Sequence, residues 1–245
     1  MKRRSEAVWN NIVTASDSAT ATLVAQRDTL WQHWSEHPWN YLSGRDLDGR
    51  PIIWTTDERD DKTPVKPFPE DQEYLRWLTD ELWNDTHRIV FVDKARQMYV
   101  STICCLIIDW YCTFVADREV VVSRVKEESA IKLINDKIRK VNARKPEWVR
   151  ARTAMSLTPE RVITYGCSGS TVTAVAQNFG VSDSRGITAS LIMVDEAAYQ
   201  EYFPQIYQAV LPMSNRLWAV TTANVGNPGA ALFRQLKDEG TGAEA

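Results

Sequence analysis

The segment that decides the fold is residues 88–115, RIVFVDKARQMYVSTICCLIIDWYCTFV. The apolar run over residues 88–92 is typical of a buried strand, and the apolar segment over residues 101–115 predicts a helix. The connector between them, residues 94–100, carries lysine and arginine. A strand, a cationic loop and a helix in this order can bind a phosphate, because the N–H groups at a helix N-terminus attract anions.

The same alternation continues along the chain. Residues 119–123, 190–194 and 217–221 each have the composition of a buried strand, and helical segments separate them. Residues 161–165 and 170–176 alternate between apolar and polar positions and predict an antiparallel hairpin. Strands that alternate with helices predict an α/β fold, whose central sheet is mostly parallel and is flanked by helices on both faces.

The residues before this domain have a different composition. Residues 5–34 predict one or two amphipathic helices, and residues 38–68 contain six prolines or glycines and a charged run, as loops and linkers do. Five of the ten tryptophans lie in the first 54 residues, which suggests docking by aromatic burial. We therefore expect a helical, Trp-rich N-terminal segment with a linker over residues 1–64, and an α/β domain over residues 65–245.

Composition narrows the class of protein. The net charge of −3 argues against a protein that coats DNA through global basicity. The cysteines form no C-x-x-C pair, so we interpret them as reduced thiols in the core and not as a zinc site. No segment approaches the roughly 18 apolar residues of a membrane span, so we expect a soluble, intracellular protein with no membrane partner.

The loop after the first strand has side chains suited to a nucleotide. Lys94 can reach phosphates, Arg96 can add positive charge, and Ser101 or Thr102 can bind Mg²⁺. The alternative is an ordinary strand-to-helix turn with surface charges.

Two acidic residues, Asp195 and Glu196, directly follow another apolar run. Phosphoryl transfer uses an aspartate in the Mg²⁺ shell and a further residue that orients and activates water. The alternative is an acidic helix start, which the helix dipole favours. At the end of the last strand, Thr221, Thr222 and Asn224 can sense a γ-phosphate by hydrogen bonds, or they can simply cap a turn.

Three further positions bear on the site. Gln72, near the start of a predicted helix, has an amide that can read adenine, although a solvated helix start explains it equally well. Arg185 can act on the ATP of a neighbouring subunit or pair with Asp183 in its own loop. Tyr99 stands where the common pattern G-x-x-x-x-G-K-[ST] has its second glycine, and a positive φ there would strain it.

Taken in order, these patterns resemble the large terminase subunit of tailed phages from about residue 65 to residue 240. The loop is similar to that family's K-x-R-Q-x-G-x-S form at Lys94, Arg96, Gln97 and Ser101. The segments over residues 185–186, 194–198 and 221–224 also look like the family, the last one like its coupling motif. Consistent signals at several positions support one another more than any single motif does.

The resemblance implies a P-loop NTPase of the additional-strand, conserved-glutamate type that uses ATP and Mg²⁺. It implies a viral DNA-packaging motor that translocates double-stranded DNA into a procapsid in the host cytoplasm. The implied partners are the portal protein, the procapsid, the small terminase subunit and further copies of the chain in a pentameric ring. The resemblance also implies a C-terminal nuclease domain. We expect this chain to lack it, either because the chain is an excised ATPase domain or because the nuclease is lost, and we therefore expect no nuclease activity.

The site expected from these arguments has three groups of residues. The catalytic residues are Glu196, Lys94, Arg96 and Arg185. The metal ligands are Ser101 and Asp195. The nucleotide-binding residues are Gln72, Lys94, Ala95, Arg96, Gln97, Met98, Tyr99, Val100, Ser101, Thr102, Thr221, Thr222 and Asn224.

Two other functions remain open. A helicase-like translocase would need a second ATPase lobe, for which the chain has no room. A catalytically weakened P-loop domain with a structural role, binding only DNA or portal, is favoured by Tyr99 in the phosphate loop.

Overall fold

The computed structural model describes residues 20–57, 60–84, 86–95, 98–178, 189–210, 214–222, 224, 226 and 228–241. The elements follow one another as a helix over residues 20–36, α2 (Pro38–Leu42), β1 (Trp54–Thr56), β2 (Val65–Pro67), α3 (Glu73–Leu82), β3 (Ile89–Asp93), α4 (Val100–Phe114), β4 (Glu119–Arg124), α5 (Glu127–Ile134), the π-helical turn η1 (Asn135–Arg139), α6 (Lys140–Arg144), α7 (Glu147–Arg152), β5 (Val162–Thr164), β6 (Thr171–Ala176), β7 (Leu191–Asp195), the 3₁₀ turn η2 (Ala197–Tyr199), α9 (Phe203–Val210), β8 (Leu217–Thr221) and α10 (Pro228–Thr241).

The main sheet has six strands in the order β3-β8-β7-β4-β6-β5. All neighbouring pairs are parallel except β5 and β6, which are antiparallel. The mostly parallel α/β fold is therefore confirmed, and the antiparallel hairpin lies at one edge of the sheet.

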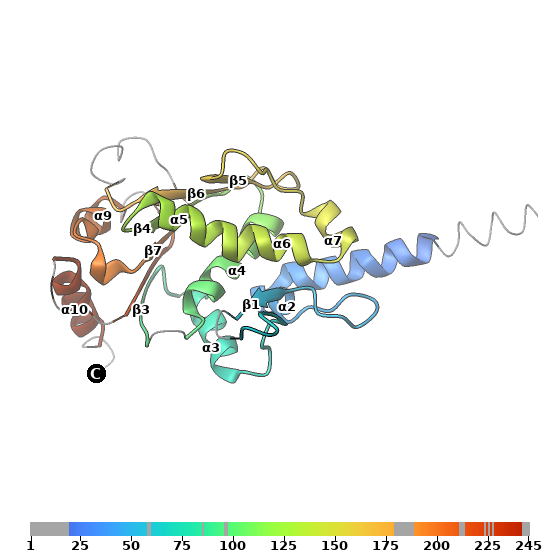
Figure 1. Ribbon diagram of the computed structural model, residues 1–245, viewed down its shortest axis with the longest axis horizontal. Helices are drawn as coiled ribbons and strands as arrows, with labels where there is room; N and C mark the ends of the chain where they lie inside the picture. The colour runs from blue at the N-terminus through green and yellow to red at the C-terminus, as the bar shows by residue number, and fades with distance from the viewer. Residues whose placement is uncertain are drawn as a thin grey trace, which may run out of the picture.

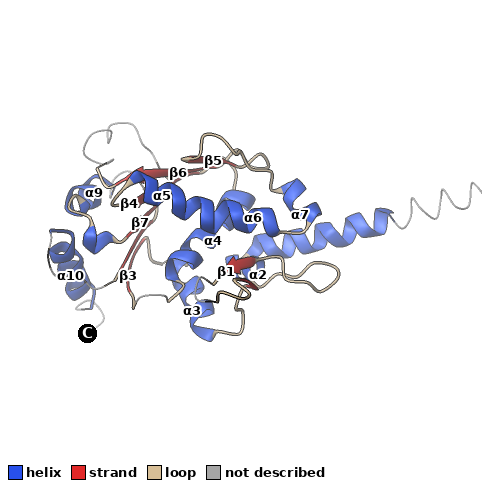
Figure 2. Cartoon of the chain, viewed as in Figure 1, coloured by secondary structure: helices blue, strands red, loops and turns tan. Residues whose placement is uncertain are grey.

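Helices cover both faces of this sheet (Figures 1 and 2). Alternate residues of each strand enter different cores, since successive side chains of a strand point to opposite faces. In β8, Trp218 packs in the core that includes α4 and α5, whereas Leu217 and Ala219 pack in the core that includes α9 and α10. Strands buried on both faces explain the continuous apolar runs of the sequence.

The helix α4 lies at the centre of the larger core. Residues 102–110 are all buried, including Asp109, so this helix is surrounded by protein on nearly every side. Such an environment accounts for the apolar composition that singled out this segment.

Trp31 and Trp34 of the N-terminal segment pack on this chain's own core. Trp34 is buried and stacks on Trp148 of α7, and its carbonyl accepts a 2.8 Å hydrogen bond from the indole of Trp110. Trp31 packs against Phe114 at the end of α4. The aromatic burial expected from the composition is thus satisfied within the chain at these positions.

Residues 38–68 contain loops, as expected, but they also contain short regular elements. They include α2 and the antiparallel pair β1–β2, and they bury Ile52, Ile53 and Phe68. The boundary expected between residues 64 and 65 falls at the start of β2, so the two paired strands lie on either side of it.

A buried charge cluster joins α4 to its neighbours. The carboxylate of Asp109 accepts hydrogen bonds from Lys145 Nζ (2.7 Å), Tyr41 Oη (2.9 Å) and Tyr165 Oη (3.0 Å). The side chains of Asp109 and Lys145 are fully buried. Burial is the main cause, and the Asp109 charge the second, that raises the pKa values of Tyr41 and Tyr165 well above the usual value for tyrosine. Both hydroxyls therefore stay protonated and remain hydrogen-bond donors.

In the part of the chain that the structure describes, no helix is both long enough and apolar enough to cross a bilayer.

Candidate nucleotide-binding site

The carboxyl ends of neighbouring parallel strands lie side by side at one edge of the main sheet. Asp93 at the end of β3 pairs with Thr221 of β8, and Asp195 at the end of β7 pairs with Val220 of β8. The segments after these strands therefore meet, at the edge where open α/β sheets bind ligands.

A chain of hydrogen bonds links the loop to the acidic pair. Lys94 Nζ donates to Ser101 Oγ at 2.8 Å, and Ser101 Oγ donates to Asp195 Oδ1 at 2.8 Å. Asp195 is fully buried, while the side chain of the next residue, Glu196, is 45 % exposed. The site thus brings a lysine, a hydroxyl and two carboxylates together; the Asp195 carboxylate is buried and hydrogen-bonded, and the Glu196 carboxylate is accessible to solvent.

Arg124, which the sequence analysis did not identify, completes this network. It is the last residue of β4, the neighbour of β7. Its Nε donates to Asp195 Oδ2 at 2.9 Å, and its Nη2 lies 3.3 Å from Glu196 Oε1. The guanidinium therefore contacts both carboxylates.

A pocket of about 410 Å³ opens over this network. Lys94, Ser101 and Arg124 form part of its wall, with side chains from β1, the loop and the α5–η1 segment. The lining residues are Thr56, Asp57, Lys94, Met98, Tyr99, Val100, Ser101, Thr102, Arg124, Lys132, Leu133, Asp136 and Lys137. Four lysines and arginines against two aspartates give the pocket a positive lining, as an anionic ligand requires.

Tyr99 immediately precedes α4 and has the positive φ considered in the sequence analysis. Its φ is 63°, in the left-handed region that favours glycine. Its hydroxyl contacts Thr55 Oγ1 of β1, and the carbonyl of the preceding residue, Met98, accepts a 2.8 Å hydrogen bond from Tyr74 Oη. The loop is therefore held from two sides.

Thr221, the last residue of β8, and the residues after it (Thr222 and Asn224) contact the turn that follows Glu196. Thr221 Oγ1 accepts a 3.2 Å hydrogen bond from the N–H of Ala198, and Asn224 Nδ2 donates to the Ala198 carbonyl at 3.0 Å. Thr222 Oγ1 lies 3.4 Å from the hydroxyl of Tyr199. These residues lie outside the pocket lining, and they reach the acidic pair through the backbone of η2.

The remaining expected positions divide into two groups. Gln72 and Ala95 do not line the pocket; Gln72 is the residue before α3, and its side chain does not cap that helix. Arg96, Gln97 and Arg185 lie outside the described residues.

The donor atoms of Ser101 and Asp195 fit Mg²⁺. A hydroxyl oxygen and a carboxylate oxygen 2.8 Å apart are hard oxygen ligands, and Mg²⁺ in phosphoryl-transfer sites takes one or two carboxylates together with substrate phosphates. Among the described residues there is no cluster of three or more His, Cys, Asp or Glu that could form an all-protein metal cage.

Two thiols lie close beneath this site. Cys104 and Cys105 are buried in α4, and burial raises the pKa of Cys105 to about 12. The Asp195 charge also raises this pKa, whereas Lys137, Arg124 and Lys94 lower it. Both thiols are therefore protonated core side chains.

One sequence signal could have identified Arg124. It ends an apolar strand in the same way as Asp195 and Thr221 do. A rule that treats every polar residue at a strand's carboxyl end as a candidate would have included it. The α5–η1 residues of the pocket carry no such signal, because a charged helix face is usually solvated.

Comparisons with known proteins identify the fold. No family model and no curated protein matches the sequence. The structure resembles the crystal structure of the HK97 bacteriophage large terminase, with a TM-score of 0.63 and 13 % identity over 85 % of this chain and 42 % of that chain. The large terminase ATPase domain of Thermus phage P74-26 matches with a TM-score of 0.46 and 13 % identity, over 63 % of this chain and 66 % of that one.

The fold assignment rests on the HK97 protein, whose TM-score exceeds 0.5. This chain spans less than half the length of that structure. The fold expected from the sequence resemblance is confirmed.

Proposed function

We propose that this chain is the ATP-hydrolysing domain of a viral DNA-packaging motor of the large terminase type. The observation that carries the proposal is the hydrogen-bond chain from Lys94 through Ser101 to the buried Asp195, with Glu196 beside it. Lysine, hydroxyl, aspartate and glutamate are the groups that P-loop phosphoryl transfer requires. Here Lys94 and Ser101 line a positively charged pocket, and hydrogen bonds and ion pairs connect them and Arg124 to Asp195 and Glu196. The fold shared with the HK97 large terminase supports the same assignment.

Each residue has a role in this proposal. Lys94 binds the β- and γ-phosphates of ATP, and Arg96 stabilises the charge that develops on the transferred group. Ser101 and Asp195 hold Mg²⁺, which when bound neutralises phosphate charge. Glu196 orients and activates the attacking water, for which its partial exposure leaves access.

The segment after β8 would report hydrolysis to the parts that hold DNA. Its hydrogen bonds to Ala198 support this role, because a shift of the turn that carries Glu196 would move Thr221 and Asn224 with it. We also propose that the motor acts on double-stranded DNA, that it docks with portal, procapsid and small terminase subunit, and that Arg185 acts on a neighbour's ATP in a ring.

The decisive test replaces Glu196 by Gln. The amide keeps the size of the side chain but cannot accept a proton from water, so hydrolysis should fall by about 10³-fold while ATP binding is retained. Phosphate release and the binding of a fluorescent ATP analogue measure the two quantities. Glu201→Gln, an exposed glutamate beyond η2, is the matched control. Full turnover in Glu196→Gln would reject the assignment.

A second function is favoured by Tyr99. It stands at a positive φ that glycine favours, and its ring occupies the pocket wall, where it can crowd the phosphates of ATP and leave the domain a structural role. Absence of turnover in the wild-type chain, alone and with DNA or capsids, would favour this alternative.

A further inference from the structure

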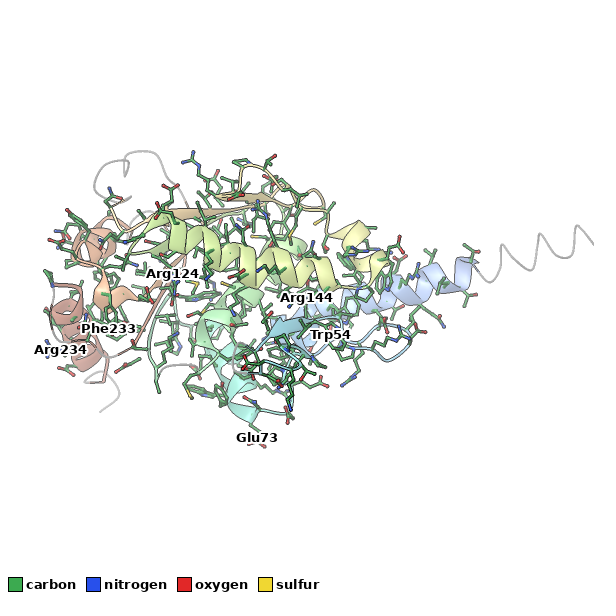
Figure 3. The ribbon with its side chains drawn as sticks, in the orientation of Figure 1. Trp54, Glu73, Arg124, Arg144, Phe233 and Arg234 are labelled. Carbon is green, nitrogen blue, oxygen red and sulfur yellow. The ribbon has the colours of Figure 1, made fainter. Side chains whose placement is uncertain are left out.

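Arg124 holds both members of the acidic pair. Its two nitrogens reach different residues, Asp195 at 2.9 Å and Glu196 at 3.3 Å. Figure 3 shows Arg124 where β4 passes into α5. A planar guanidinium suits this geometry, because its fork can bond two oxygens at once.

The charges around this arginine balance. Arg124 contacts two carboxylates, and Lys94 reaches one of them through the Ser101 hydroxyl. Two positive and two negative side chains therefore form a compact group. Mg²⁺ at Asp195 would have to share the carboxylate with the guanidinium, and two cations on one carboxylate repel each other.

Arg124 also faces the space where a ligand would lie. Its side chain is 23 % exposed and lines the pocket together with Lys94. An arginine that only supported the buried Asp195 would have no need to line the pocket. A guanidinium so placed can exchange carboxylate oxygens for phosphate oxygens, which have the same bidentate geometry.

We propose that Arg124 is a counter-ion that exchanges partners when nucleotide binds. Without nucleotide it neutralises Asp195 and Glu196 and disfavours metal binding. When the phosphates of ATP occupy the pocket, its guanidinium moves to them, which leaves Asp195 available to Mg²⁺ and Glu196 to water. Metal binding then depends on nucleotide. This inference rests on the proposed ATPase function and adds a residue to it.

The test measures Mn²⁺, a paramagnetic substitute for Mg²⁺, in the full chain without nucleotide. Replacing Arg124 by Gln removes the repulsion between the guanidinium and the metal ion, so the affinity for Mn²⁺ should rise by about ten-fold. ATP turnover should fall by about 100-fold, the usual effect of losing one group that stabilises developing charge. Arg76→Gln, an exposed arginine of α3 outside the pocket, should change neither quantity.

A second variant covers the case in which Arg124→Gln does not fold. Arg124→Lys keeps the charge beside the buried Asp195 but cannot span both carboxylates. Its turnover should fall by about ten-fold at unchanged affinity for an ATP analogue. Turnover equal to the wild type in Arg124→Lys, or Mn²⁺ affinity equal to the wild type in a folded Arg124→Gln, would overturn the inference.

The outcomes separate this inference from the proposed function. If the wild-type chain neither binds nor hydrolyses ATP, the proposed function fails. If the wild type hydrolyses ATP, Glu196→Gln is inactive and Arg124→Gln behaves like Arg76→Gln, only the role of Arg124 is rejected.

Discussion

Tyr99 combines a conformational cost with a specific contact. A residue other than glycine in the left-handed region costs roughly 1–2 kcal/mol, and Tyr99 has a φ of 63°. Its hydroxyl contact with Thr55 offsets part of this cost and fixes the ring in the pocket wall. The loop is therefore held in one shape before any ligand arrives.

Replacing Tyr99 by Gly should leave the domain about 1 kcal/mol more stable than replacing it by Ala, because both changes remove the ring and only glycine relieves the strain at positive φ. Urea unfolding measures the free energy of unfolding of the two variants. Equal stability of Tyr99→Gly and Tyr99→Ala would contradict the strain at this position.

The residues of the site differ in how far the sequence predicts them. Lys94, Asp195 and Glu196 each come at or directly after the end of an apolar strand, and Ser101 lies in the first turn of the helix after the loop. Their meeting therefore follows from the shared edge of parallel strands. The contacts of Arg124 could not be predicted without knowing which strands are neighbours, because its partner Asp195 is 71 residues away in the sequence. That Gln72 recognises adenine stays a prediction. Gln72 does not line the pocket, so its position does not support that role.

At the level of elements, the end of the short strand β1 forms part of the pocket wall. Thr56 and Asp57 belong to the lining, and Arg144 of α6 donates to Thr56 Oγ1 at 2.9 Å. Figure 3 shows Arg144 and Trp54 side by side, and Arg144 also lies 3.4 Å from the Trp54 carbonyl. The wall thus depends on a contact between elements far apart in sequence.

Replacing Arg144 by Met should loosen this wall without unfolding the domain. Hydrogen bonds to a charged group are worth about 1.5 kcal/mol, so amides of β1 and β2 should exchange hydrogen about ten-fold faster. Hydrogen exchange detected by mass spectrometry measures this effect. Arg150→Met on α7, which is exposed, is the control, and equal exchange in the two variants would contradict the role of Arg144.

Long apolar runs made most of the elements predictable, and short elements were missed. The strands β4, β7 and β8 bury both faces, and the edge strand β3 is partly buried, which leaves a clear apolar signal in the sequence. The strands β1 and β2 have three residues each and lie among prolines and charges, so their pairing could not be predicted from local pattern. The π-helical turn η1 likewise has no signal in the helical stretch that contains it.

For the molecule as a whole, the buried thiols should make the free energy of unfolding fall at alkaline pH. Burial raises the pKa of Cys105 to about 12, and raises those of Cys104 and Cys112 well above the usual value. Above pH ~9 the unfolded chain releases these protons while the folded chain keeps them. The unfolded state then binds fewer protons, so stability falls as pH rises.

Between pH ~9 and 12, Cys105 should lower the free energy of unfolding by about 1.4 kcal/mol per pH unit. Urea unfolding at pH 7.5, 9 and 10 measures the slope, which should be smaller in Cys105→Ala. Ile107→Val, a buried change in the same helix that removes no titrating group, should keep the wild-type slope. Parallel curves for Cys105→Ala and the wild type would contradict the prediction.

The packing of residues 34–53 has a practical consequence for anyone who prepares a shortened recombinant version. Trp34, Tyr41, Ile52 and Ile53 belong to the same core as α4. A fragment cut before residue 65 would open that core to solvent and would remove one of the hydroxyl donors of the buried Asp109. Truncation at the apparent linker would therefore yield an aggregation-prone product, so expression should retain the helix that starts by residue 20.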